Sequence, residues 1–488
     1  MQTVKVRLDG PGGLPMNETA LKSLYASGLD FEPDERRMRI QPDGTVELQV
    51  TQSPYMIHAK IAVPLYGHLW VMADNLGEGY TGGFVDFVSE AVRTYIAWAK
   101  RFGEGVELSV ATRAHLDAAV ELEHLANRGM DTPDNRLYAL SHAIYAAEGA
   151  LVEKSRAALT PRKDLRLGCN FARFTSPSSR YAKFFANAFD FATLPFYPGR
   201  TVPEKGKYDY GYIDKALAFL TEKGITPKGH PLFFGHKEVN PPWMLALSYP
   251  ELRKEAAAIA KHHVEAYRGV IDIWDAMNEA HDWANCFELD QAQLVDLTRA
   301  TTDALREGND KAVSIVNVCL PFAEYVAGRY NCYGALPEHL RSPLKYFRTI
   351  LEAGVDFDVV GIQLYFPGRD MVAVSRMLDA YAALGKPIHI TEMGVNGGFR
   401  VKGNAGSSWS QLDMSEGTWH GGWNEHTQAD WMEQFYTIAA ARKEIRALTW
   451  WDFIEPSFSG NGAFLYEDEN PREIYFRLLA LKEKLQAR

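Results

Sequence analysis

Two acidic residues end apolar runs that could bring them to one place. Glu279 follows Asn278 after the run 274–277, and Glu392 follows the run 388–391. A pair of carboxyl groups can divide a reaction between them, because one can protonate a leaving oxygen while the other attacks carbon. The hydrolysis of a glycosidic bond uses such a pair. Glu279 and Glu392 are therefore the candidate catalytic residues.

Similar positions carry other side chains that suit a sugar. Amide, imidazole and phenol groups exchange hydrogen bonds with hydroxyl groups, and aromatic faces stack on the apolar face of a sugar ring. The candidates for substrate binding at the ends of further apolar runs are His230, Phe234, Gln363, Tyr365 and Trp450. Asp275 lies within the run before Glu279, and we expect it to be a buried structural acid that orients this strand end.

The segment 394–431 is long and rich in tryptophan. A loop of this length in a compact domain is usually functional or mobile. Trp419 and Trp423 could line a sugar cleft, so both are candidate substrate contacts, although either could instead pin the loop to the rest of the protein. Trp431 fits the second role, because it belongs to the inner face of a predicted helix.

Eight strand-like runs between residues 161 and 488 must position these side chains. Each run is short and apolar, and most are followed by a longer stretch of helical spacing. The predicted strands are 165–169, 189–193, 226–234, 270–277, 312–318, 357–364, 387–391 and 445–451. This alternation predicts a parallel sheet, and eight units predict a (β/α)8 TIM barrel of the α/β class. The C-terminal strand ends meet at one mouth of such a barrel, where the candidates should converge.

Two shorter regions precede the predicted barrel, which we assign to residues 161–488. Residues 1–83 alternate apolar runs with turn residues and predict a small antiparallel, sandwich-like β domain. Residues 84–160 change to helical spacing and predict a helical connector. The β domain could be a carbohydrate-binding module with Trp70 on its platform, or a structural cap on the barrel. The cap is favoured, because aromatic residues show no regular spacing.

Composition excludes several other classes of protein. The chain has 62 acidic and 52 basic residues and a net charge of −10, so it lacks the clustered positive charge that nucleic-acid binding requires. Apolar runs fall short of the roughly 18–20 residues of a membrane helix. Metal-ligand spacing and nucleotide fingerprints are missing, so we expect neither a metal nor a cofactor. The first residues show no signal-peptide pattern, which predicts a cytoplasmic protein, or a secreted one whose signal has been removed.

Five ordered segments resemble motifs of glycoside hydrolase family 10, the xylanase family. They correspond to barrel strands 3, 4, 6, 7 and 8 of that family and are residues 228–234, 274–280, 361–365, 388–392 and 448–450. The resemblance covers the barrel and not residues 1–160. It implies a retaining mechanism in which Glu279 is the general acid/base and Glu392 is the nucleophile.

The resemblance also implies a substrate and roles for the neighbours. Asn278 would hold the sugar 2-hydroxyl, and Gln363 and His230 would bind the sugar next to the cleaved bond. Trp450 would form a wall of the same subsite. The expected partner is an oligosaccharide or polysaccharide, in particular a β-1,4-linked xylan-type plant glycan.

The chain departs from the family pattern in three places. Tyr365 stands where the family has a histidine, and a phenol can donate a hydrogen bond to Glu392 but cannot become a cation at neutral pH. Phe234 replaces a tryptophan. Segment 193–197 is apolar and aromatic where the family has Glu-Asn and a lysine that bind the next sugar. We therefore expect a short or decorated substrate to be preferred over linear xylan.

Other functions fit the residues less well. A carbohydrate-binding barrel without catalysis has no chemical need for both Glu279 and Glu392, and a metal-dependent hydrolase would need a ligand set that is missing. A β-glycosidase acting on a non-xylan glycoside stays open. For a retaining enzyme we expect the two carboxyl groups to lie about 5–5.5 Å apart, with a raised pKa at Glu279 and an ionised Glu392.

Overall fold

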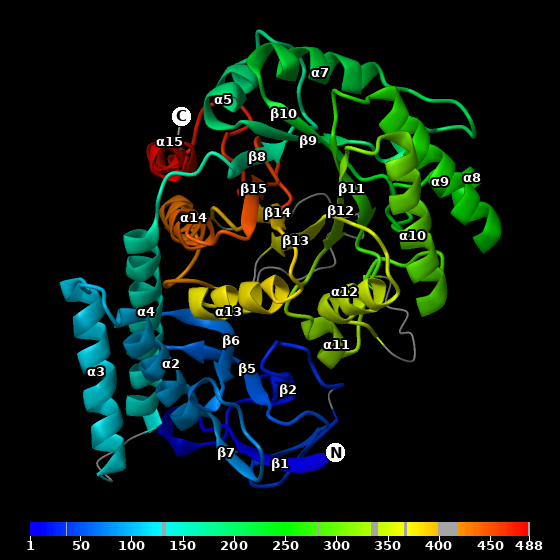
Figure 1. Ribbon diagram of the computed structural model, residues 1–488. Helices are drawn as coiled ribbons and strands as arrows, with labels where there is room; N and C mark the ends of the chain where they lie inside the picture. Colours follow the sequence, from blue (N-terminus) through cyan, green and yellow to red (C-terminus); the bar gives the residue numbers. More distant parts are fainter. Residues whose placement is uncertain are drawn as a thin grey trace.

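Eight parallel strands close into a barrel in the second part of the chain (Figure 1). The computed structural model describes residues 1–488 except 36, 129–132, 282, 333–339, 366–367, 399–417 and 487–488. The barrel strands are β8 (Arg166–Asn170), β9 (Phe191–Pro195), β10 (Thr226–His230), β11 (Ile273–Asn278), β12 (Val313–Val318), β13 (Val359–Tyr365), β14 (Ile388–Gly394) and β15 (Ile445–Trp450). β15 pairs with β8 and closes the sheet. The predicted (β/α)8 fold is confirmed, and each predicted strand overlaps an observed one.

The barrel strands are buried on both faces, between a packed interior and the outer helices. Every residue of β9 and of β14 is buried, which is why these segments lack the alternation of a half-exposed strand. Gly229 on β10 lies against the indole of Trp274 on β11. A Cβ at Gly229 would come within 2.1 Å of that ring. The packing of Trp274 therefore requires glycine at this position.

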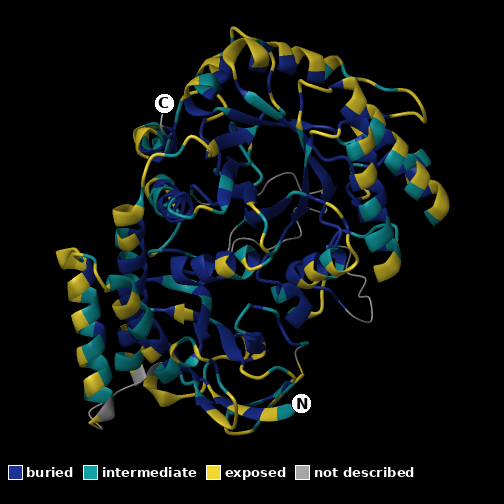
Figure 2. Cartoon of the chain, viewed as in Figure 1, coloured by how far each residue is buried: buried dark blue, intermediate teal, exposed yellow. Residues whose placement is uncertain are grey.

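Helices surround the barrel and turn their buried faces toward it (Figure 2). The longer helices are α5 (Arg180–Ala188), α7 (Gly211–Lys223), α9 (Tyr249–Ala266), α10 (Gln291–Gly308), α12 (Pro343–Glu352), α13 (Met371–Ala382), α14 (Glu425–Ala440) and α15 (Glu473–Leu485). Short helices lie in the connections: α6 (Pro198–Thr201), α8 (Pro242–Leu245) and α11 (Glu324–Gly328). Within the described ranges, no helix is long and apolar enough to cross a membrane.

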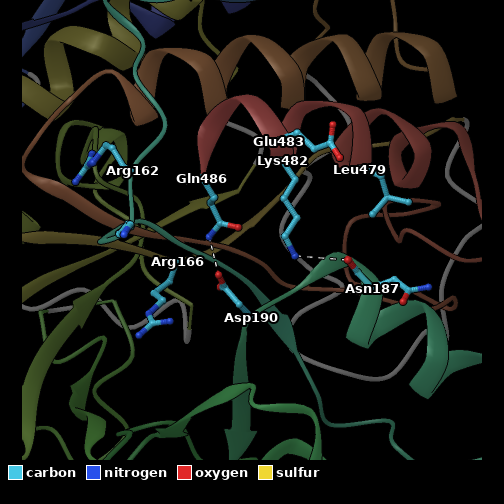
Figure 3. Close-up of a pocket in the computed structure, with 9 residues that line it drawn as sticks. Arg162, Arg166, Asn187, Asp190, Leu479, Lys482, Glu483 and Gln486 are labelled. Atoms are coloured by element: carbon cyan, nitrogen blue, oxygen red, sulfur yellow. Dashed lines mark hydrogen bonds between the residues drawn. The ribbon is translucent and has the colours of Figure 1, made fainter. Parts of the chain in front are cut away.

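The end of the last helix, α15, contacts the chain beside the first two strands of the barrel. The side-chain amide of Gln486 donates to Asp190 Oδ2 at 2.6 Å (Figure 3). It also donates to the Leu165 carbonyl at 2.6 Å. Lys482 donates to the Ala188 carbonyl at 3.0 Å. These contacts tie the C-terminal part of the chain to the first two barrel strands.

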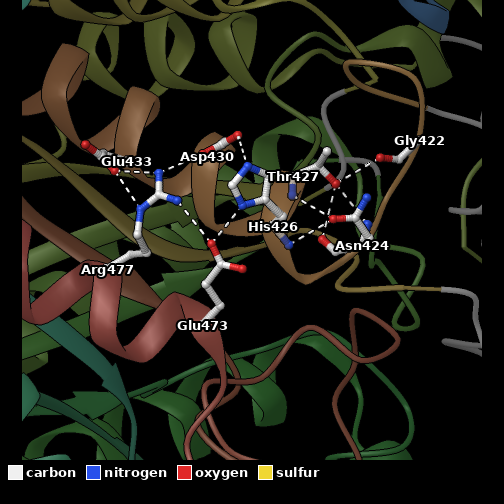
Figure 4. Close-up of polar contacts among 8 residues, drawn as sticks. All are labelled: Gly422, Asn424, His426, Thr427, Asp430, Glu433, Glu473 and Arg477. Carbon is white, nitrogen blue, oxygen red and sulfur yellow. Dashed lines mark hydrogen bonds and ion pairs between the residues drawn. The ribbon is translucent and has the colours of Figure 1, made fainter.

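Helix α14 is held at its start by a side-chain cap and along its length by α15. Asn424 accepts a hydrogen bond from the backbone N–H of Thr427 at 3.0 Å, which satisfies a donor of the first turn. Arg477 on α15 donates to Asp430 and Glu433 on α14, each at 2.6 Å (Figure 4). These contacts hold α14, the first helix after β14, against α15.

The N-terminal region contains two small sheets, which lie beside helices. One sheet has the order β3 (Met38–Ile40), β4 (Val46–Val50), β1 (Gln2–Arg7), β7 (Phe84–Asp86), and the other has the order β2 (Tyr25–Ser27), β5 (Met56–Val63), β6 (Gly67–Ala73). Helical elements of this region are η1 (Pro11–Gly13), α1 (Glu18–Ser23), η2 (Asn75–Gly77), α2 (Phe87–Gly103), α3 (Val110–Asn127) and α4 (Pro133–Ala158). The strand pairs within residues 1–83 are antiparallel, as predicted. β1 also pairs in parallel with β7, which begins at Phe84 in the segment that was predicted to be helical.

The N-terminal region packs against helix α13 of the barrel. Buried residues of both parts belong to one continuous hydrophobic core. Arg376 on α13 donates to Asp74 at 2.5 Å, and Glu148 on α4 accepts from the backbone N–H of Met371 at 2.7 Å. The division of the chain into three domains stays a prediction, because this shared core joins the regions.

We expect Asp74→Asn to destabilise the protein by about 3 kcal/mol, because Arg376 would remain buried without its countercharge. Asp74 is fully buried and also accepts from the indole N–H of Trp98 at 2.8 Å. Urea unfolding measures the change. Glu18→Gln is the control, since the Glu18–Lys22 pair is exposed and its loss should leave the unfolding midpoint unchanged. Equal midpoints for both variants would contradict the prediction.

Candidate active site

A cavity of about 690 Å³ opens at the C-terminal ends of the barrel strands. Glu279 and Glu392 both line it. The cavity also takes in most of the predicted substrate-binding residues, namely His230, Phe234, Asn278, Gln363 and Tyr365. Strand ends that are far apart in the sequence thus place two carboxyl groups and several polar side chains around one space.

Glu279 lies immediately after β11, in a strained backbone conformation. Its φ is 52°, in the left-handed region that favours glycine. The backbone N–H of Glu279 donates to the Asn317 carbonyl at 2.8 Å, which helps to hold this conformation. The side chain is buried, and its Oε1 accepts from Gln363 Nε2 at 2.9 Å. Burial raises the pKa of Glu279 to about 7, so this carboxyl can hold a proton near neutral pH.

Glu392 lies on β14 and is surrounded by hydrogen-bond donors. Its Oε1 accepts from Asn317 Nδ2 at 3.1 Å, and its Oε2 accepts from the Tyr365 hydroxyl at 3.0 Å. His230 Nε2 lies 3.6 Å from Oε1. Burial raises the pKa of Glu392 to about 7, and His230 opposes this rise. Burial places the pKa of Tyr365 far above its ordinary value, so its phenol remains a neutral donor.

Amide side chains connect the two carboxyl groups. Asn317 Nδ2 donates to Asn278 Oδ1 at 2.7 Å as well as to Glu392. Gln363 Nε2 donates to Asn278 Oδ1 at 3.2 Å as well as to Glu279. Asn278 is thus the shared acceptor between the two acids. This chain of amides fixes the relative position of Glu279 and Glu392; their expected separation stays a prediction.

A buried ion cluster orients His230. Asp275 Oδ2 accepts from Lys228 Nζ at 2.7 Å and lies 2.5 Å from His230 Nδ1. Burial acts to raise the pKa of Asp275, but the positive charge of Lys228 and the bonds with His230 outweigh it and lower that pKa. The resulting carboxylate holds the imidazole so that its other nitrogen faces Glu392. The structural role expected for Asp275 matches this position.

The two carboxyl groups are suited to different protonation states. The contacts of Glu279 Oε1 are with the neutral amides of Gln363 and Asn278, and the neighbouring Cys319 thiol is also neutral, because burial raises its pKa. Glu392 accepts hydrogen bonds from Asn317 and Tyr365 and lies 3.6 Å from His230 Nε2, and these neighbours favour its anion. Because buried neighbouring acids titrate together, the pair should hold one proton near neutral pH, on Glu279. The raised pKa at Glu279 was expected; the rise at Glu392, caused by burial, was not.

The sequence model of glycosyl hydrolase family 10 matches residues 170–479, which is more than half of the chain. This chain belongs to glycosyl hydrolase family 10. It is therefore a glycoside hydrolase, and the resemblance found in the motifs is confirmed. The matched range contains both Glu279 and Glu392 and leaves out the N-terminal sheets and helices.

Proteins similar to this family 10 member are named as xylanases. Endo-1,4-beta-xylanase B of Thermotoga neapolitana is 24% identical over 312 residues, which make up 59% of this chain and 78% of that protein. Endo-1,4-beta-xylanase A of Caldicellulosiruptor saccharolyticus is 26% identical over 211 residues, or 40% of this chain and 56% of that protein.

Solved structures share the barrel of this family 10 chain. Xylanase 10B of Thermotoga petrophila RKU-1, solved in complex with xylobiose, has a TM-score of 0.50 at 19% identity and covers 69% of this chain and 96% of its own. Native xylanase 10B of Thermotoga maritima has a TM-score of 0.50 at 19% identity and covers 68% and 97%. At this identity the likeness establishes the fold.

Trp450 does not line the cavity of this family 10 chain, in contrast to the expected wall. Its side chain is fully buried, its indole N–H donates to the Gly462 carbonyl at 2.9 Å, and its ring packs edge-on against Phe464. The next residue, Trp451, lines the cavity, with its ring centre 5.4 Å from that of His230. Successive side chains of a strand point to opposite faces, so the wall belongs one residue later.

Trp419 and Trp423 also lie away from the cavity. Trp419 is 2% exposed, donates to Glu148 Oε1 at 3.2 Å and stacks on His420. Trp423 stacks on Trp419 with a ring-centre distance of 6.2 Å. Both therefore pin the end of the long loop to helix α4, which was the alternative reading. The reason is the buried carboxylate of Glu148, which provides an acceptor that the sequence did not reveal.

Sequence reasoning missed several residues of the site. Asn317 touches Glu392, and its one signal was a polar amide inside the apolar run 312–318. Tyr197 was not missed, because it belongs to the aromatic segment 193–197 that the sequence marked; it lines the cavity and packs edge-on against His230, 5.6 Å between ring centres. Arg173 and Arg200 also line it, and they lie in connections that no motif marked.

Proposed function

We propose that this chain hydrolyses β-1,4-linked xylan-type glycans by a retaining double displacement, with Glu392 as nucleophile and Glu279 as general acid/base. The observation that carries the proposal is the pair of buried carboxyl groups joined through Asn278, Asn317 and Gln363 at the mouth of the barrel. The names of the relatives support the substrate class.

In the first step, a carboxylate oxygen of Glu392 attacks the anomeric carbon of the bound sugar. The bond from that carbon to the glycosidic oxygen breaks, and Glu279 gives its proton to this oxygen, so the leaving sugar departs as an alcohol. Asn278 lies beside both acids, where it can bind the sugar 2-hydroxyl. Asn317, Tyr365 and His230 keep Glu392 oriented and favour its anionic form.

In the second step, Glu279 is a carboxylate and accepts a proton from water. The water oxygen bonds to the anomeric carbon, and the ester bond to Glu392 breaks and restores its carboxylate. Glu279 ends protonated and ready for the next cycle. Two inversions at one carbon give overall retention of configuration.

The covalent intermediate provides the direct test of this proposal. A 2-fluoro xyloside with a good leaving group should form an ester slowly broken down by water, and mass spectrometry of peptides should place the label on Glu392. Proton NMR during hydrolysis of xylo-oligosaccharides should show the β-anomer first. The α-anomer as first product would overturn the double displacement, since a single displacement inverts configuration.

The pH profile should report the shared proton. We expect kcat/KM to fall as pH rises through about 7, because Glu279 then loses the proton that it must donate. On the acid side, protonation of the pair beyond one proton removes the carboxylate of Glu392, and kcat/KM falls again. A profile on xylo-oligosaccharides without a falling basic limb would contradict the assignment of Glu279.

Tyr365→Phe should lower kcat about tenfold or more and change KM little. The phenol donates to Glu392 Oε2, and a hydrogen bond to a charged group is worth about 1.5–3 kcal/mol. Phenylalanine keeps the ring that packs edge-on against Phe458. Tyr138→Phe on α4 is the matched control, because this tyrosine is exposed. A rise in KM with unchanged kcat would assign Tyr365 to substrate binding instead.

A further inference from the structure

Two arginine side chains line the same cavity as the catalytic carboxyl groups. Arg173 follows β8, and Arg200 lies in α6, directly after β9. β8 and β9 are hydrogen-bonded neighbours in the barrel. Both arginines therefore belong to one wall of the cavity, formed by the ends of two adjacent strands.

Tyr212 lies close to both arginine-bearing segments. Its hydroxyl accepts from the backbone N–H of Phe174 at 3.1 Å and donates to the Phe171 carbonyl, so it contacts the chain on both sides of Arg173. Burial raises the pKa of this phenol to about 12, and the positive charge of Arg200 acts against that rise. Arg200 is thus near enough to Tyr212 for its charge to reach the segment that carries Arg173.

Both arginine residues are exposed, and neither guanidinium group forms an ion pair in the described part of the chain, although the charge of Arg173 also acts on the buried Asp452. Arg173 donates through Nη2 to the Pro456 carbonyl at 2.7 Å, which fixes the group while leaving other N–H donors available. The backbone at Arg200 is anchored through its neighbour, because the N–H of Gly199 donates to the Val239 carbonyl at 2.8 Å. The wall therefore holds two positive groups on anchored backbone.

Aromatic rings accompany these charges. Tyr197 and Trp451 line the cavity, and each packs edge-on against the His230 ring. Flat apolar faces can hold a sugar ring while a charged group reads its substituent. Segment 193–197 is also where the chain departs from the polar pattern of its family.

We propose that Arg173 and Arg200 bind a carboxylate carried by the substrate, so that the preferred substrate is a β-glycan bearing uronic-acid substituents. This inference rests on the proposed hydrolysis of xylan-type glycans. A guanidinium group matches a carboxylate through paired N–H donors, and the charge strengthens these hydrogen bonds. A neutral xylan chain offers hydroxyl groups alone and makes no use of either charge.

Three xylo-oligosaccharides of equal backbone length test the proposal. One is linear, one carries a glucuronic-acid branch, and one carries the same branch with its carboxyl group reduced to an alcohol. We expect the wild-type enzyme to cleave the acidic substrate with a kcat/KM about five- to tenfold above that for the reduced one, as one charge-assisted contact allows. Sodium chloride at about 0.5 M should reduce this preference by screening.

Variants assign the preference to the arginines. Arg200→Gln should remove the preference, because it lowers kcat/KM on the acidic substrate much more than on the linear or the reduced one, and Arg200→Lys should retain part of the preference. Arg173→Gln should also weaken it. Arg113→Gln, on the exposed face of α3, loses the same charge far from the barrel mouth and should keep the preference.

The outcomes separate this inference from the proposed function. Equal kcat/KM for the acidic and the reduced substrate in the wild-type enzyme, with clear activity on both, would overturn the carboxylate site and leave the proposed hydrolysis standing. A preference that survives in the double variant Arg173→Gln, Arg200→Gln would overturn it as well. Absence of cleavage of all three substrates would overturn the proposed function itself.

Discussion

Glu392→Gln should lower kcat by about 10⁴-fold or more on every substrate, whatever its leaving group. The amide of glutamine has nearly the size and shape of the carboxylate but is a poor nucleophile, so the covalent intermediate cannot form. It would also place an N–H group beside the donors of Asn317 and Tyr365, which are arranged for an anion. The binding of substrate should change far less than kcat.

Steady-state kinetics on an aryl β-xyloside and on a xylo-oligosaccharide measure this loss. Glu352→Gln is the matched control, because Glu352 ends α12 at the exposed surface and undergoes the same chemical change. Circular dichroism and thermal unfolding must show that the Glu392 variant folds. A folded Glu392→Gln variant that retained a tenth of wild-type kcat would show that the nucleophile is elsewhere.

Glu279→Gln should lower kcat/KM by about 10³-fold for sugar leaving groups, the range typical of a lost general acid. The effect should depend on the leaving group, because a dinitrophenolate departs without protonation whereas a sugar alkoxide does not. With a dinitrophenyl xyloside, formation of the intermediate should stay fast, and its hydrolysis should become the slow step. The basic limb of the pH profile should disappear at the same time.

Pre-steady-state kinetics with the two classes of substrate distinguish this result from general damage. The expected pattern is a burst of dinitrophenolate followed by slow turnover, beside near absence of cleavage of xylo-oligosaccharides. Equal loss on both classes would mean that Glu279 acts through structure. A normal basic limb in the variant would assign that limb to another group.

The barrel and its catalytic acids were predictable because local and global patterns agree there. Short apolar runs are typical of strands buried on both faces of a parallel sheet. Glu279 and Glu392 each follow such a run directly, which places both at strand ends. The helical connector at residues 84–160, which contains α2, α3 and α4, followed from its spacing in the same way. Each of these features depends on residues that are close together in the sequence.

The sites that sequence reasoning misplaced depend on distant partners. Trp450 and Trp451 are equally plausible as walls in the sequence, and a one-residue choice of face decides between them. Trp419 lies away from the cavity because its indole donates to Glu148, which lies on a helix of another region. Arg173 and Arg200 come to line the same cavity because the strands before them pair. Such choices are made by tertiary contacts, which no local pattern records.

The left-handed backbone at Glu279 puts folding and catalysis in opposition at one position. A non-glycine residue in this region of φ costs about 1–3 kcal/mol, and glycine would relieve that strain while removing the acid. Directed evolution that rewards thermal stability alone would therefore enrich inactive sequences at position 279. Libraries of this enzyme should be sorted on turnover first, and stabilising changes should be sought in the helices that face solvent, where no such conflict exists.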